Sequence, residues 1–322
     1  MKRSVKIWLI VAVALIVSGL ILFGGAMFMI GWNFDKLSTD SLETVSFTPD
    51  REFKNLSLYT TTANIKFLPS ADSNVRVECR DRKNVEYNVS VDGDTLRIES
   101  TSGGKWYERI VMFQFESPSV TVYLPKTQYG ALTVKENTGN IEIPKEFSFE
   151  GIDITADTGN VKNYASAGNI RIKTTTGSIK MDSLSANDVE LSVETGKVTV
   201  SDLRCGNNMS VKVGTGKCEL DGVSCARFTS EGDTGKIEMK NLIATDRITV
   251  ERSTGDVRFE SCDAAEIFVE TDTGDVTGSL LSDKIFRTDT DTGREDVPKT
   301  NTGGICEITT DTGDIIFSII SE

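Results

Sequence analysis

The sequence repeats itself about every twenty residues over most of its length. A Thr-Gly pair marks each repeat, and successive glycines are 18 to 20 residues apart. A fixed period of this length is typical of solenoids, in which each repeat forms one coil and stacked coils bury a shared core. Ten glycines occupy the marked position: Gly139, Gly159, Gly177, Gly196, Gly216, Gly235, Gly255, Gly274, Gly293 and Gly313.

Apolar residues fall at fixed offsets from these glycines. In the repeat around Gly274 they include Ile267, Val269 and Val276, and the same offsets are apolar in most other repeats. Because they are spaced two apart on each side of the glycine, they indicate strands rather than helices. The predicted fold is therefore all-β, a single-stack, β-helix-like solenoid with coils of 19–20 residues that stack in chain order. The Thr-Gly pair is predicted to be a structural corner, at which glycine supplies a positive φ.

The segment 7–32 contains no charged residue. It is long enough to cross a bilayer, for which a helix of about 20 residues suffices. Its length and the absence of a small-x-small cleavage site favour an uncleaved anchor over a cleaved signal peptide. Lys2, Arg3 and Lys6 precede it, which predicts a cytoplasmic N-terminus. We therefore expect a single-pass protein of the cell membrane whose bulk is extracytoplasmic.

The chain divides by pattern into five parts. These are a cytoplasmic stub (1–6), the transmembrane anchor (7–32), a linker (33–50), an N-terminal β portion (51–130) and the regular Thr-Gly repeats (131–322). Ala63 stands where the repeats have glycine. The segment 101–117 does not have apolar residues at the offsets seen in the repeats, and it is expected to be an inserted loop or hairpin. Its aromatic residues are predicted to close the end of the solenoid, with ligand contact as the alternative: Trp106, Tyr107, Phe113 and Phe115.

Composition excludes several kinds of function. The chain has no histidine, which removes the usual Ser/His/Asp and Cys/His nucleophiles and imidazole zinc sites. A net charge of −13 repels phosphate backbones, so no nucleic-acid partner is expected. There is no Cys-x-x-Cys motif, and no cofactor is expected. Of the six cysteines, Cys218, Cys262 and Cys306 fall at offsets that are apolar in the other repeats and are predicted to be buried, while Cys205 and Cys225 could form a disulfide between neighbouring coils.

Acidic residues flank the late corners and raise the possibility of calcium binding. The candidate ligands are Asp272, Asp275, Asp291, Asp311 and Asp314. Clustered oxygen ligands suit Ca²⁺, but the corners lack a regular calcium loop, and earlier corners carry lysine instead. Solvated charge is the simpler interpretation.

The order of motifs resembles a known family. Residues 56–67 have the pattern Leu-x-Leu-x-Thr-x-x-Ala-Asn-Ile-x-Phe. The segments DGDTLRI and VTVYLP follow, and after them come the Thr-Gly-Asp/Asn-Ile/Val repeats. Over residues 43–322 the chain resembles the bacterial putative-adhesin family. The resemblance implies an extracytoplasmic β-strand-repeat domain of unknown function, often carried on single-pass membrane proteins. It brings no catalytic residues, and in some members the gene context implies signalling in envelope stress.

We therefore predict a non-enzymatic, adhesin-like module that interacts with an unidentified envelope or surface ligand. One alternative is an accessory protein in envelope stress sensing, which would act through a membrane protein partner because the stub is too short for a signalling domain. Another is a carbohydrate-active enzyme, although no cluster of acid, base and aromatic platform stands out. The apolar C-terminal strand, with Ile316 and Phe317, is predicted to be an open solenoid edge through which copies of the chain associate.

Overall fold

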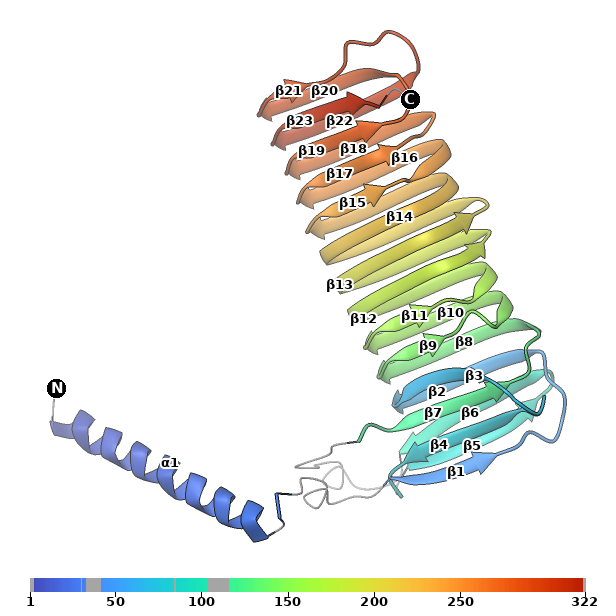
Figure 1. Cartoon of the computed structure of the whole chain (residues 1–322), viewed down its shortest axis with the longest axis vertical. Coiled ribbons are helices and arrows are strands. Elements are labelled where there is room, and N and C mark those ends of the chain that lie inside the picture. Colours follow the sequence, from blue (N-terminus) through green and yellow to red (C-terminus); the bar gives the residue numbers. More distant parts are fainter. Residues whose placement is uncertain (1–2, 30, 33–41, 84, 103–115, 321–322) are drawn as a thin grey trace.

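The computed structural model describes residues 3–29, 31–32, 42–83, 85–102 and 116–320. The prediction of an all-β solenoid preceded by one helix is confirmed, because every described strand belongs to one 23-stranded sheet wound into a rod (Figure 1). The helix α1 spans Arg3–Met29. Its part from Trp8 to Met29 has a mean hydropathy of 2.6 and is long and apolar enough to cross a membrane. Trp106, Tyr107, Phe113 and Phe115 lie outside the described residues.

Each regular coil has one strand before its corner and one after it. The strands before the corner are β8 (Gln128–Thr138), β10 (Ser148–Thr158), β16 (Ile243–Thr254), β18 (Glu266–Thr273), β20 (Lys284–Thr292) and β22 (Gly304–Thr312). Those after it are β9 (Ile141–Ile143), β11 (Val161–Asn163), β15 (Ile237–Lys240), β17 (Val257–Cys262), β19 (Val276–Leu280), β21 (Glu295–Asp296) and β23 (Ile315–Ile319). In the middle of the rod the strands continue through corners, as β12 (Ser166–Ala186), β13 (Asp188–Cys205) and β14 (Asn208–Thr234).

The core is one column of buried side chains along the rod. Neighbouring coils pair in parallel with equivalent residues opposite each other, so Leu132, Ile152 and Ile170 form one stack that is at most 2% exposed. The same cluster of buried residues continues from Leu56 to Phe317. Since inward side chains are buried in this way, the outward-facing rows are the part of the solenoid that a ligand can reach.

The coils at the tip do not stack in chain order. Strand β22 lies between β18 and β20, and β23 lies between β19 and β21 (Figure 1). The prediction that the C-terminal strand forms an open edge is therefore wrong. Phe317 is 5% exposed, and its ring packs against Phe259 and Phe286 with centroids 5.6 and 5.8 Å away. Because β23 is paired on both sides, the structure does not support the predicted association of copies of the chain through Ile316 and Phe317.

The outermost coil at the tip, β20–β21, ends the core with polar side chains. Thr288 and Glu295 stand where other coils have aliphatic residues, and Thr288 Oγ1 donates a hydrogen bond of 2.7 Å to Glu295 Oε2. Thr290 Oγ1 donates to the carbonyl of Gly313 on the coil beneath. A solenoid needs such a terminal coil because its last layer faces water.

The base of the rod is also built out of order. Strands β2 (Asn55–Thr62) and β3 (Asn64–Pro69) pair directly with β8 and β9, so Ala63 adjoins Gly139 in the corner column. The intervening chain folds onto the outer side of this coil. There β6 (Thr95–Ser102) and β7 (Ser119–Leu124) pair in parallel with it, and β5 (Val85–Asp92), β4 (Arg76–Asp81) and β1 (Glu43–Phe47) add antiparallel strands. The change to antiparallel pairing ends the stack of coils.

Candidate functional site

The ten corner glycines form one continuous column along the rod. At every one of them a Cβ atom would lie 1.7–2.3 Å from the carbonyl oxygen of the adjacent corner residue. Eight of the ten also have φ between +126° and +154°. The close approach of backbones explains the Thr-Gly motif without any ligand, since no side chain fits between neighbouring corners.

Toward both ends of the rod, the residue after the corner glycine links one coil to the next through its side-chain oxygen. Asn140 Oδ1 accepts a hydrogen bond of 3.0 Å from the backbone N–H of Asn160. Near the tip, carboxylates take over this role: Asp275 accepts from the N–H of Asp314, and Asp314 accepts from the N–H of Arg294, both at 2.9 Å. Two of the five calcium candidates, Asp275 and Asp314, therefore satisfy backbone donors of the fold.

The other three calcium candidates stand on the opposite side of the corner. Asp272, Asp291 and Asp311 precede the Thr-Gly pair and are exposed. Within the described ranges no three acidic, cysteine or histidine side chains converge in a way that would hold a metal ion. The structure does not bring the five carboxylates together, and calcium binding stays an untested hypothesis.

All six cysteines are buried and unpaired. Cys218, Cys262 and Cys306 are at most 1% exposed, which confirms that they act as small core residues. Cys205 and Cys225 follow the paired residues of two neighbouring coils, yet their thiols are not joined. Burial raises the pKa of both thiols, that of Cys225 to about 12, so little thiolate forms at neutral pH.

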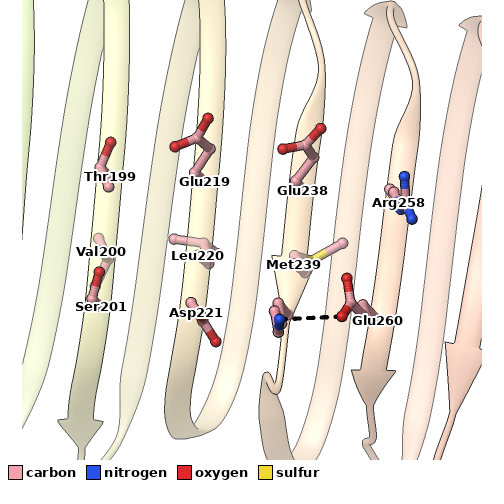
Figure 2. Close-up of a pocket in the computed structure, with 11 residues that line it drawn as sticks. Thr199, Val200, Ser201, Glu219, Leu220, Asp221, Glu238, Met239, Arg258 and Glu260 are labelled. Carbon is pink, nitrogen blue, oxygen red and sulfur yellow. Dashed lines mark ion pairs between the residues drawn. The ribbon is translucent and has the colours of Figure 1, made fainter.

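A shallow pocket of about 430 Å³ in the middle of the rod collects acidic side chains (Figure 2). Figure 2 shows Glu219 and Glu238 extending in parallel from adjacent strands. Glu260, in the same pocket, forms an ion pair of 3.2 Å with Lys240. Two neighbouring carboxyl groups can serve in acid–base catalysis if one of them is protonated at working pH, so the charge state of Glu219 and Glu238 decides what this pocket can do.

Lysines at the positions that directly follow the corner glycines, which we call the corner row, neutralise the carboxylates of Glu219 and Glu238. Lys217 Nζ lies 2.6 Å from Glu219 and 2.7 Å from Glu238, and each glutamate has one further lysine partner at 2.6 Å, Lys197 or Lys236. Hydrogen bonds from these lysines lower the pKa of Glu219 and hold that of Glu238 at about 2. A general acid needs a raised pKa, so this pair is suited to an ion-pair ladder and not to proton donation.

A second groove, nearer the base, has the opposite charge. It has a volume of about 530 Å³ and crosses β3, β9, β11, β12 and β13. Four lysines and one glutamate line it, together with asparagine side chains of the corner row. We call this surface the lysine groove and define it by Lys66, Glu142, Lys162, Lys180 and Lys197.

The lysine groove is not evident from the sequence alone. The available signal was the row three residues after each corner, which holds lysine at 66, 162 and 180 but glutamate at 219 and 238. Reading that row as one surface requires knowing that Lys66 lies only two strands from Lys162, which the register shows.

The model of one protein family covers nearly the whole solenoid. The Toastrack DUF4097 model matches residues 53–318. The chain belongs to this family. Solved structures similar to this Toastrack fold include a putative adhesin from Parabacteroides distasonis, with a TM-score of 0.52 and 14% identity, covering 76% of this chain and 98% of that one.

Two further solved structures are less similar to this Toastrack chain. A putative adhesin from Parabacteroides merdae has a TM-score of 0.48 and 14% identity, covering 76% of this chain and 98% of that one. A putative lipid binding protein from Parabacteroides distasonis has a TM-score of 0.41 and 14% identity, with coverages of 75% and 95%. No curated protein matches the sequence.

One buried carboxyl lies at the base of the Toastrack rod. Glu136 is 2% exposed, and its Oε1 accepts hydrogen bonds of 3.1 Å from the backbone N–H groups of Ala63 and Thr138. Its Oε2 has no partner among the described residues. Burial raises the pKa of Glu136 to about 7, with a smaller contribution from the charge of Asp81, whose carboxylate also accepts a hydrogen bond from Tyr87.

We expect this carboxyl to make the Toastrack rod less stable as pH rises. Between pH 4.5, its ordinary pKa, and about 7, folded Glu136 keeps a proton that the unfolded chain releases. The free energy of unfolding therefore falls by up to about 1.4 kcal/mol per pH unit across this window. Glu136→Gln keeps the Oε1 acceptor and has no proton to lose. The free energy of unfolding of the variant, relative to that of the parent, should therefore increase by roughly 3 kcal/mol between pH 4.5 and pH 8.

The measurement is urea unfolding of both full-length chains at a series of pH values. Acidic groups that do not interact with Glu136 titrate equally in both chains, so the difference between the two curves reports Glu136 together with its coupling to Asp81. A difference that stays constant from pH 4.5 to pH 8 would show that Glu136 is already ionised in the folded protein at the acidic end of the window.

Proposed function

We propose that this Toastrack protein is a membrane-anchored, extracytoplasmic and non-enzymatic binding module of adhesin-like type. The observation that carries the proposal is the distribution of its side chains. Inward columns are buried along the whole stack, while outward rows repeat at every coil and form long faces with grooves along them. Such a rod offers extended lateral surfaces for a ligand.

The anchor and its orientation are supported by the N-terminal sequence. The apolar stretch from Trp8 to Met29 suits a single membrane crossing, and the nearby basic residues are biased to its N-terminal side, where Lys2, Arg3 and Lys6 precede it while Lys36 follows it. This arrangement favours a cytoplasmic N-terminus and a solenoid held outside. A role at the cell surface agrees with the similarity of the fold to the putative adhesin from Parabacteroides distasonis.

The carbohydrate-active alternative is less well supported. In the mid-rod pocket, Glu219 and Glu238 are paired with lysines that keep both carboxylates ionised. A glycosidase needs one of its two carboxyl groups protonated at working pH. A regulatory role through a membrane partner is distinguished from adhesion by experiment.

The test uses the full-length chain in phosphatidylcholine nanodiscs. These are passed over immobilised envelope polysaccharides, neutral and charged, and over surface proteins, with empty nanodiscs as the control. We expect retention on at least one of these polymers without any shortening of it, as measured by size-exclusion chromatography. Shortened polysaccharide would indicate an enzyme. Retention on none, together with altered phosphorylation of a co-reconstituted sensor kinase, would support the regulatory role.

Orientation is tested in cells that express the full chain. External protease should digest the solenoid in intact cells, releasing fragments that carry residues from the Thr-Gly repeats. If the solenoid is cut only after lysis, the proposed topology is wrong.

A further inference from the structure

The lysine groove is a local reversal of charge. The whole chain has a net charge of −13, yet this groove has four lysines and a single glutamate. At physiological ionic strength charges are screened beyond about 8 Å, so a ligand in the groove responds mainly to these neighbouring side chains. An anionic group can therefore be attracted here although the rest of the rod repels it.

Lysines on the same face differ in how they are neutralised. Toward the tip, Lys217, Lys236 and Lys240 each have a carboxylate within 3.2 Å. Lys66, Lys162 and Lys180 are exposed, and no described residue forms an ion pair with any of them. The row three residues after each corner thus carries unpaired lysines near the base, whereas toward the tip it carries Glu219 and Glu238, which pair with lysines on the row directly after the corner.

Two of the unpaired lysines are direct neighbours. Lys162 on β11 and Lys180 on β12 stand opposite each other in the parallel register. Like charges placed directly opposite destabilise a sheet, so folding alone does not account for this pair. An anionic group bound between the two ammonium groups would remove the repulsion.

The shape of the groove favours an elongated ligand. Its lining comes from five consecutive strands, which at about 4.8 Å per strand extend about 19 Å along the rod axis. Asn64, Asn140 and Asn160 follow one side of it and add amide groups. These amides already hydrogen-bond one another along the ladder of corners, so the lysines are the groups that a ligand would meet. A compact anion would contact only part of this length, whereas a linear polymer can meet successive lysines.

We propose that the lysine groove binds a linear acidic polysaccharide, laid along the rod axis with its anionic groups at Lys66, Lys162 and Lys180. This inference rests on the proposed binding function and specifies its ligand class and its surface. Lys197 contributes at the tipward end, where it also pairs with Glu219. Glu142, which lies between Lys66 and Lys162, opposes binding.

The test measures binding of polygalacturonate fragments to the full-length chain in phosphatidylcholine nanodiscs. The same fragments with methyl-esterified carboxylates serve as an uncharged ligand on an identical backbone. We expect binding only to the charged form, weakening as salt is raised. Lys162→Gln combined with Lys180→Gln should weaken it about tenfold, and Glu142→Gln should strengthen it about two- to threefold.

Lys217→Gln combined with Lys236→Gln is the matched control. It removes the same charge from the same face outside the groove, so binding should change less than about twofold. The inference is overturned if both double variants weaken binding equally, if the esterified fragments bind as well, or if no fragment binds. It is also overturned if the groove variants change only the binding of phosphatidylglycerol vesicles, since the ligand would then be a lipid surface.

Failure of this inference leaves the proposed function separately testable. Retention on a neutral polysaccharide or a surface protein, with unchanged retention of the groove variants, would support a binding module that uses another face. Retention on no immobilised ligand of either kind would count against both.

Discussion

Replacing Gly216 with alanine is expected to lower the free energy of unfolding by on the order of 4–5 kcal/mol. The added Cβ would lie 1.7 Å from the carbonyl oxygen of Gly196, and the residue has φ of +143°. The obstacle is backbone, so no rotamer change can relieve it. Moving the two coils apart would break parallel hydrogen bonds on both sides of the corner. The measurement is urea unfolding of the full-length chain followed by far-UV circular dichroism.

Gly151→Ala is the matched control. Gly151 lies on an outward row of the same solenoid, where the nearest atom to a new Cβ is the carbonyl oxygen of Asn169 at 3.8 Å. The paired residue on β8 is already an alanine, Ala131. This variant should stay within about 1 kcal/mol of the parent. Equal unfolding midpoints for Gly216→Ala and Gly151→Ala would show that backbone approach at the corner does not limit stability.

Replacing Phe317 with alanine is expected to cost about 3–5 kcal/mol of local stability at the tip. The ring is 5% exposed and packs between Phe286 on β20, in the coil above, and Phe259 on β17, two coils below, because Gly278 in the coil between has no side chain. Contacts in a solenoid are limited to nearby coils, and the damage should stay near the tip. Hydrogen exchange should therefore speed up in β17 to β23 and stay unchanged in β8 to β11.

Ile316→Ala provides the comparison for Phe317. Ile316 is the adjacent residue of β23, but it faces outward and is only partly buried. Its truncation should leave exchange at the tip nearly unchanged. If the two variants behave alike, β23 is an open edge after all, and the insertion of β22–β23 beneath β20–β21 is wrong.

The sequence predicts the coil well because its pattern is local. Alternation around each glycine determines which side chains point inward, and Ile267, Val269 and Val276 are all at most 3% exposed. The order of the coils is not encoded in this way. Every repeat presents the same corner and the same columns, so β22 can pair with β18 as well as β20 could. Only the polar substitutions Thr288 and Glu295 distinguish the coil that ends the stack.

The lysine groove was beyond sequence reasoning for a related reason. Lys66 and Lys162 are 96 residues apart in the chain, but Glu142 alone separates them in the register. Whether a lysine on this face of the rod is paired depends on the side chains around it, including those of adjacent coils, as the contrast between Lys162 and Lys217 shows. Charge at one position can be read from the sequence, but its neutralisation cannot.

The out-of-order layers at both ends also set how the rod can be assembled. Most neighbouring coils join residues 18 to 20 apart, whereas β8 reaches its neighbour β2 over 76 residues and β18 reaches β22 over 39. Closing longer loops slows folding. The middle of the rod can therefore grow coil by coil during synthesis, but β20–β21 must wait, unpaired, until β22–β23 have emerged. At each end, therefore, an earlier segment of the chain is completed only when a later segment pairs with it.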